Sequence, residues 1–316
     1  MLILVNSFHG IEQKNTPWSD GVPGVTQPLI EPGEEFTHRF KAEQFGFYHA
    51  HAHSSMSPIP IRYTVRANAM IESMQDDGLV MPIYIRPSPS RDRPFAQVST
   101  DPIDLEQMLA AEQNAYPFLV SDWRHNTSDE MRQLWRDANI EPLCAQSILI
   151  NGQGSVVCPT ADELLAMGAA RGFGNLTEQG CANRPCSFNK HSSSNSCLSV
   201  DNPVINSFLN ESSPSLVPEE LYRTCSDQGV DNPLYTIKID TNLTKWAMFN
   251  FVNSGGMWEE KVSIDGHPMW IVAVEGEYVN VTEPVNAVSV RDIARLKRET
   301  ADAFSYSWQQ EFVSKL

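Results

Sequence analysis

The chain has 316 residues, enough for one large domain or two of ordinary size, and 41% of its residues are hydrophobic. Its formal net charge is -16 and no cluster of Lys and Arg occurs, so nucleic acid is not an expected partner. No run of about 18 apolar residues is present, so no membrane-spanning segment is expected.

Strand signals dominate the first hundred residues. The runs "LILVNSF", "EEFTHRFKAE", "GFYHAHAH" and "VMPIYI" are apolar or alternating, and the Gly- and Pro-rich stretch "WSDGVPGVTQPLIEPG" predicts a loop. In the second run, Phe36, His38 and Phe40 share one face. Short strands separated by turn residues predict an all-β sandwich or barrel.

A boundary is expected after residue 115, because "DPIDLEQMLAAEQNAYP" predicts a short helix or connector with Asp104 near its start. Beyond it, "FLVSDWRH" predicts a strand and "TSDEMRQLWRDA" a helix with Thr127 or Ser128 as its N-cap. The stretch "SILINGQGS" predicts a strand that runs into an Asn-Gly turn. Residues 160–215 are rich in Ser, Asn, Gly and Cys, so we expect an irregular excursion tied by disulfides.

Strands return in the last third of the chain, in "PLYTIKIDTN", "KWAMFNFVNS", "EKVSIDGHPMWIVAVEGEYV" and "VNAVSV". Residues 291–316 have a helical spacing of apolar side chains instead, with these residues roughly on one side: Ile293, Leu296, Phe304, Trp308 and Phe312. We therefore expect two consecutive β domains, 1–115 and 116–290, followed by an atypical helical tail, 291–316.

Cysteines and glycosylation signals suggest a secretory origin. Six clustered cysteines without a CxxC pair favour disulfides over zinc, and six cysteines allow about 15 connectivities. Five N-x-S/T sequons accompany them. The start, "MLILVNSFHG", has no basic region and an apolar run of only residues 1–5, so no signal peptide is expected within this sequence.

The stretch "FYHAHAHSS" places three histidines at alternate positions, His49, His51 and His53. On a strand these side chains point to one face, and His9 lies upstream at another strand end. Neutral imidazole is a common ligand for copper and zinc. The sequence therefore predicts either a metal site built from two strands or a polar sheet face without a metal.

Residues 8–48 closely resemble the first cupredoxin-like domain of fungal multicopper oxidases, the laccase group. The segments that carry the resemblance are "FHGI", "WSDGVPGVTQ", "IEPGEEFTHRF" and "FGFY". "PLYTIKID" and "DGHPMWIVAVEGEYV" resemble the second such domain, and "EPLCAQSILINGQG" resembles ascomycete members of pigment and secondary-metabolite pathways. The resemblance covers roughly residues 1–290 and implies tandem cupredoxin-like Greek-key β-sandwiches, two of the usual three domains.

The resemblance implies copper ligands residue by residue. The family's first H-x-H pair falls on Ser7 and His9, so a serine replaces one histidine. Counting without gaps from Gly46 puts the second pair at His51 and His53, with His49 in the place of an aromatic residue. A register that uses His49 and His51 needs a deletion, and we prefer His51 and His53.

Asp20 resembles an acidic residue that helps to deliver protons to oxygen, although a plain Asp-Gly turn is the alternative. The family's H-x-x-H-x-H and H-C-H motifs, which complete the trinuclear cluster and the type 1 copper site, do not occur here.

About eighteen residues, 57–74, resemble an insertion after the histidine strand. Together with Ser7, the atypical tail and the unmatched family motifs, this insertion suggests a truncated or mis-spliced family member.

The resemblance implies a multicopper oxidase-type oxidoreductase that uses copper to oxidise small phenolic substrates and reduces dioxygen. It also implies a secreted protein that contacts neither nucleic acid nor membrane. The alternative is a catalytically incomplete cupredoxin-like protein that lacks the type 1 copper.

Overall fold

The computed structural model describes residues 5–22, 25–28, 30, 33–53, 73–138, 145–156, 158–171, 176, 178, 218–221, 225, 233–255, 260–289 and 309–315. The expected insertion is therefore almost wholly outside the described residues, which resume at a short helix, α2 (Ser73–Asp76). None of the described helices is long and apolar enough to cross a bilayer.

The chain forms two compact units, each discontinuous in sequence. The first comprises Met1–Ser121, Ile150–Gly152 and Tyr235–Leu316, and the second comprises Asp122–Leu149 and Gln153–Leu234. This division differs from the boundary expected after residue 115. The reason is that strands from distant parts of the sequence join one sheet in the first unit.

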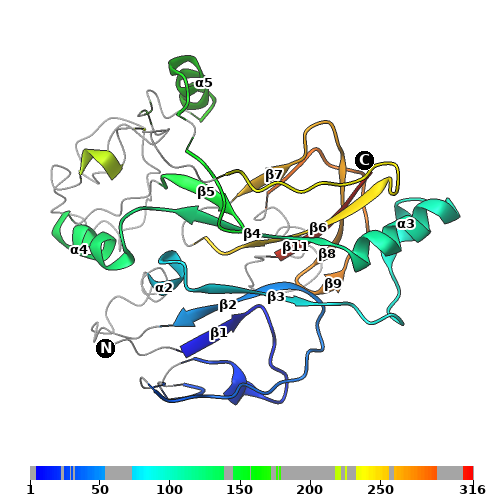
Figure 1. The fold of residues 1–316 in the computed structure, drawn as a ribbon, viewed down its shortest axis with the longest axis horizontal. Coiled ribbons are helices and arrows are strands. Elements are labelled where there is room, and N and C mark those ends of the chain that lie inside the picture. The colour runs from blue at the N-terminus through cyan, green and yellow to red at the C-terminus, as the bar shows by residue number, and fades with distance from the viewer. Residues whose placement is uncertain are drawn as a thin grey trace, which may run out of the picture. The chain divides into compact units, whose positions relative to one another are not determined.

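A three-stranded antiparallel sheet lies at the start of the chain (Figure 1). Its order is β1 (Val5–His9), β2 (Gly46–His53) and β3 (Val80–Ile85), so β2 is central. Alternation puts Tyr48 and Ala50 on one face of β2 and His49 and His51 on the other, and all four are buried. A central strand covered on both faces fixes the orientation of its side chains.

A larger sheet carries most of the core of the first unit, in the strand order β5-β4-β6-β11-β8-β9. β4 is parallel to β6, and β6, β11, β8 and β9 are antiparallel neighbours. A two-stranded sheet, β7 with β10, completes the described strands. The bounds are β4 (Tyr116–Trp123), β5 (Ser147–Ile150), β6 (Trp246–Asn253), β7 (Lys261–Ser263), β8 (Met269–Val274), β9 (Glu277–Tyr278), β10 (Ala287–Ser289) and β11 (Gln309–Lys315).

Every residue of β6 is buried, so this strand separates two apolar clusters. Ala247, Phe249 and Phe251 belong to one cluster, in which Phe118 of β4 stacks on both phenylalanine rings. Trp246 and Met248 belong to the other. Each fully buried large apolar side chain contributes about 1.5–3 kcal/mol of transfer free energy, so β6 is the central hydrophobic element of this unit.

The helix expected near Asp104 is present as α3 (Pro102–Gln113). Asp101 is its N-cap and accepts a hydrogen bond from the amide of Ile103, which explains where the helix begins. Near the other end, the buried carboxylate of Glu112 accepts hydrogen bonds from Arg93, at 2.8 and 3.0 Å, and from the hydroxyl of Tyr278. This pairing compensates for the burial of the charge.

Two further helices belong wholly to the second unit. The expected α4 (Ser128–Ala138) begins with a capping box, in which Thr127 and Glu130 exchange hydrogen bonds. α5 (Ala161–Arg171) lies in the stretch expected to be irregular, so that expectation was wrong for these residues. Thr160 and Glu163 form the same capping box, a signal that the Ser- and Cys-rich composition downstream obscured.

A disulfide joins Cys158 to Cys225 across 67 residues of sequence, which confirms disulfide use for this pair. The other four cysteines lie outside the described residues. Closing a loop of this length restricts the unfolded chain and is worth roughly 4 kcal/mol in the chain-entropy model. The disulfide therefore ties the excursion of the second unit together.

Two expected strands have no strand pairing among the described residues. Residues 34–43 form no strand. The ring of Phe8 contacts the rings of His38 and Phe40, and the ring of His38 also contacts that of Phe36. The three side chains therefore lie on one side of the segment, as the alternation predicted. Residues 233–240 form no strand either, although alternate side chains of this segment pack on the Phe249 cluster. Alternation reports which side chains are buried, but it does not determine whether the backbone finds a partner strand.

The prediction of a helical tail was wrong for the part of it that the structure describes, because residues 309–315 form the strand β11. This strand pairs with β6 on one side and β8 on the other, from Gln309 opposite Val252 to Lys315 opposite Trp246. Ser314 is fully buried and its hydroxyl donates to the carbonyl of Pro268. The helical spacing was misleading because the gain from pairing on both edges outweighs local preference.

Removing β11 by ending the chain after residue 308 should abolish cooperative unfolding of the first unit. β6 and β8 would each lose a hydrogen-bonded neighbour and become exposed edges, which favour aggregation. Thermal unfolding and size-exclusion chromatography would measure the effect. A chain shortened only by Leu316 is the control, and an unchanged midpoint in the longer truncation would refute the central role of β11.

The turn after β5 supports a second prediction. Asn151 has a φ of 51°, its side-chain oxygen accepts from the amide of Leu119, and its side-chain nitrogen donates to the carbonyl of Pro117. Asn151→Ala should lower the free energy of unfolding by about 2–3 kcal/mol, since both bonds disappear and alanine tolerates this φ poorly. Urea denaturation measures it, with the exposed Asn242→Ala as control. A loss equal to that of the control would contradict this role.

Candidate metal centre

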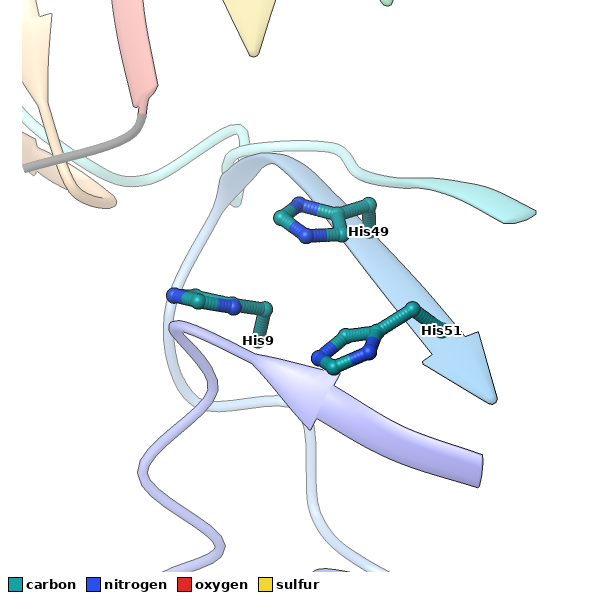
Figure 2. A group of neighbouring side chains, drawn as sticks. All are labelled: His9, His49 and His51. Carbon is teal, nitrogen blue, oxygen red and sulfur yellow. The ribbon is translucent and has the colours of Figure 1, made fainter. Parts of the chain in front are cut away.

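Three histidine side chains converge where β1 ends beside β2 (Figure 2). The antiparallel register places His9 opposite His49 and Ser7 opposite His51. Directly opposed residues project to the same face of a sheet, and so do alternate residues of one strand. One face of the small sheet therefore carries all three imidazoles.

The rings are close enough to share one ion. The centroids of His9 and His49 lie 4.7 Å apart in a stacked arrangement, and that of His51 lies 5.8 Å from His9 and 5.6 Å from His49. One nitrogen from each ring can be chosen so that all three lie within 4.8 Å of one another. A point equidistant from three atoms at that spacing is about 2.8 Å from each, and zinc–imidazole bonds are about 2.0–2.1 Å. Closing this difference requires ring movements of about 1 Å, and the stacked rings of His9 and His49 must also turn, because the nitrogen lone pairs lie in the ring planes.

His49 is the most enclosed of the three. It is 1% exposed, and neither of its ring nitrogens has a hydrogen-bond partner among the residues that the structure describes. Leaving a buried polar group without a partner costs about 1–3 kcal/mol, so an imidazole in this position is unusual unless something binds it. Figure 2 shows the ring beside those of His9 and His51, whose centroids lie 4.7 and 5.6 Å from its own.

The electrostatics favour a neutral ring at His49. Burial, followed by the nearby His9 and His51, holds the pKa of His49 well below its ordinary value of 6.5. A neutral imidazole keeps the lone pair that a metal ligand needs. His49 is therefore in the protonation state that binds a transition metal at neutral pH.

Comparison with known proteins identifies the family to which this arrangement belongs. One family model described as multicopper oxidase matches residues 4–76, and a second with the same description matches residues 114–293. Laccase abr2 of Aspergillus fumigatus is 34% identical over 288 residues, which cover 90% of this chain and 42% of that protein. The chain belongs to the multicopper oxidase family. Multicopper oxidase CTB12 of Cercospora beticola is 36% identical over 282 residues, covering 86% of this chain and 38% of that protein.

Solved structures of the family have the same fold. The laccase from Botrytis aclada has a TM-score of 0.50 at 15% identity, and the iron-import multicopper oxidase Fet3p has 0.50 at 14%. They cover 99% and 100% of this chain and 36% and 35% of those proteins. These matches confirm the expected cupredoxin-like β architecture. The chain spans less than half the length of these curated and solved multicopper oxidases.

Copper is the metal of the multicopper oxidases, and the described residues fit it. Buried neutral imidazoles suit copper, which exceeds zinc in affinity for most nitrogen sites. The observation that supports this fit is that both ring nitrogens of the buried His49 lack a hydrogen-bond partner among the described residues.

Two of the three expected metal ligands, His9 and His51, lie in this cluster. The backbone of His53 pairs with Val5 at the far end of the strand, and its side chain lies outside the described residues. His49 belongs to the cluster instead, although the preferred register left it out. Strand alternation was the signal that included it.

Asp20 follows the 3-10 helix η1 (Pro17–Ser19), and its amide donates to the carbonyl of Pro17 at 3.2 Å. It is half-buried and is not a member of the histidine group. His38 contacts the carbonyl of Ser19 through Nδ1, and His267 contacts that of Lys315, so neither joins the site.

Acid should destabilise the metal-free chain through His49. The unfolded state takes up a proton near pH 6.5, whereas the folded state resists it, so the contribution of the neutral ring is complete above pH 6.5 and is lost as pH falls below it. His9 of β1 is the titratable group opposite this ring, His51 lies beside it, and Pro82 faces it from β3. The free energy of unfolding measured from pH 7.5 to 5 should therefore fall.

The same titration of His49→Phe should fall less steeply, because this variant removes the buried base. The exposed His125→Gln provides the control and should follow the unmodified chain. Equal slopes for all three proteins would contradict the assignment to His49.

Proposed function

We propose that the chain is the copper-binding part of an oxidoreductase that oxidises small phenolic substrates and reduces dioxygen to water. The observation that carries this proposal is the group of buried imidazoles on one sheet face in a member of the multicopper oxidase family. Each phenolic hydroxyl gives up one electron and one proton, and one dioxygen takes four of each to become two waters. Copper, when bound, supplies the one-electron redox steps.

His9, His51 and His53 are the proposed copper ligands. The sheet would hold them rigidly, because β2 is central and buried, and a rigid strand positions ligands more accurately than a loop does. Asp20 is the proposed proton carrier, since a half-buried carboxylate at a loop can exchange protons with solvent. The role of Asp20 and the ligand role of His53 rest on the family resemblance.

Secretion and the phenolic substrate class belong to the same proposal. Laccase-type names among the relatives and the Cys158–Cys225 disulfide support it. The division into domains at residue 115, with an insertion at about 57–74, is also proposed. The family-model matches at 4–76 and 114–293 are compatible with it.

A second candidate is a cupredoxin-like protein that binds copper but does not complete the reaction. Ser7 favours it, because this serine lies opposite His51 at the position where the family resemblance implies a histidine. A serine hydroxyl is a poor copper ligand. Copper binding without oxygen consumption would identify this alternative.

Copper content and oxygen uptake test the proposal together. The purified chain, loaded with Cu(II) and desalted, should retain copper in elemental analysis and consume dioxygen in an oxygen electrode with catechol as the phenolic substrate. His9→Phe should retain less copper and lose the oxygen uptake, while His125→Gln should behave as the unmodified chain. Retention of no copper would refute the proposal, and copper without oxygen uptake would favour the second candidate.

Restoring the missing histidine gives an independent test. Ser7→His would add an imidazole opposite His51, on the face that already carries the cluster, and should raise copper retention above that of the unmodified chain. Elemental analysis after desalting measures it. Phe8→His, on the opposite face of β1, is the matched control and should not raise retention. Equal retention in all three proteins would argue against copper binding at this face.

A further inference from the structure

We propose that His49 is a metal ligand, and that His9, His49 and His51 hold a single copper ion as a three-imidazole site. This inference rests on the copper binding proposed above and departs from it in one ligand, since His49 takes the place of His53. It assigns the metal to the residues that the sheet register brings together, rather than to those that the family resemblance selects.

The rows of the sheet show why His49 is suited to this role. One cross-strand row consists of His9, His49 and Pro82, and the next contains Ser7 and His51. Pro82 has no hydrogen-bonding side chain, so within its own row only His9 offers His49 a polar side chain. The two rings stack at 4.7 Å, and in the described part of the chain no hydrogen-bond partner reaches either nitrogen of His49.

The two rows also account for the unusual residues of this chain. The resemblance implies histidines at positions 7, 9 and 51 and an aromatic residue at position 49. This chain has serine at position 7 and histidine at position 49. The two rows therefore carry three imidazoles both in the family pattern and in this chain. The difference is that the histidine is at position 49 instead of position 7, which is the diagonally opposite position on the same face. A buried histidine that replaces an aromatic residue and has no partner is explained by a metal that needs a third nitrogen.

A core role for His49 predicts a different arrangement. A structural buried histidine normally donates one ring N–H to a carbonyl or a carboxylate, as His38 and His267 have carbonyl partners here. Within the described residues His49 has no such bond. Its ring lies beside two other imidazoles, and one nitrogen from each of the three rings lies within 4.8 Å of the others. Three imidazoles with an open coordination position are a known donor set for a single transition-metal ion.

Copper titration of paired variants tests the inference. The full chain should bind one Cu(II), measured by equilibrium dialysis. Its electron paramagnetic resonance spectrum should show nitrogen hyperfine splitting from three equivalent donors. His49→Phe, which introduces an aromatic residue of similar size, should weaken binding by at least about 100-fold, because removing a direct ligand should exceed the 10–100-fold effect of removing a supporting group. The splitting should then correspond to two donors.

The exposed His125→Gln should leave both the affinity and the spectrum unchanged. His53→Phe is measured in parallel, because it separates the two ligand sets. Circular dichroism and thermal unfolding of each variant establish that it folds. Should His49→Phe fail to fold, His49→Gln keeps a polar side chain of similar length and is expected to show the same loss of one nitrogen donor.

The outcomes separate this inference from the proposed function. If the full chain binds no copper, both fail. If His53→Phe weakens binding and His49→Phe does not, the proposed ligand set stands and the role of His49 is wrong. If His49→Phe binds copper as tightly as the unmodified chain with an unchanged spectrum, the inference is overturned whatever the other variants do.

Discussion

The register between β1 and β2 is the constraint on which the candidate site depends. Pairing of His9 with His49 and of Ser7 with His51 places three imidazoles on one face. Because side chains alternate along a strand, a slip of one residue would turn β1 over and separate His9 from the other two. The register is itself held by burial, since Tyr48 and Ala50 fill the opposite face of β2 and would have to enter the site if that strand turned. The same apolar packing that stabilises the sheet thus positions its polar ligands.

Burial and chemistry act in opposite directions at His49. Enclosing an imidazole without hydrogen bonds destabilises the fold, and the lowered pKa expresses the same cost as resistance to protonation. Burial of a charge is compensated elsewhere, where Arg93 and Tyr278 surround the carboxylate of Glu112. Among the described residues, the buried side-chain amides of Gln13 and Gln27 also lack hydrogen-bond partners, and His49 differs from them in lying beside two other imidazoles.

Local signals were sufficient for much of the fold. Alternation predicted β2, and the run "KWAMFNFVNS" predicted β6, which is buried on both faces. The capping residues of α4 were also readable, because a capping box involves residues only three apart. What local reading missed depends on distant partners. β11 is a strand because β6 and β8 both offer it an edge, and residues 34–43 are not a strand because no partner pairs with them.

The site was predictable to a similar extent. Alternation put His49, His51 and His53 on one face, but the choice among them was decided by counting along a family pattern. That count does not include the cross-strand register, which depends on where β1 ends and pairs His9 with His49. A sequence motif therefore identified the strand that carries the ligands, while the neighbouring strand determined which of them meet.

The number of imidazoles separates copper binding from the complete reaction. Reduction of dioxygen to water needs four electrons, and one copper ion cycles one at a time. Three imidazoles within 4.8 Å of one another suit one ion, because each ring that ligates it leaves little room for a second ion in the same group. Under the proposed function, copper binding depends on the small sheet, whereas turnover also depends on four successive one-electron transfers. Copper retention and oxygen uptake can then respond differently to a change at Ser7, which lies opposite His51.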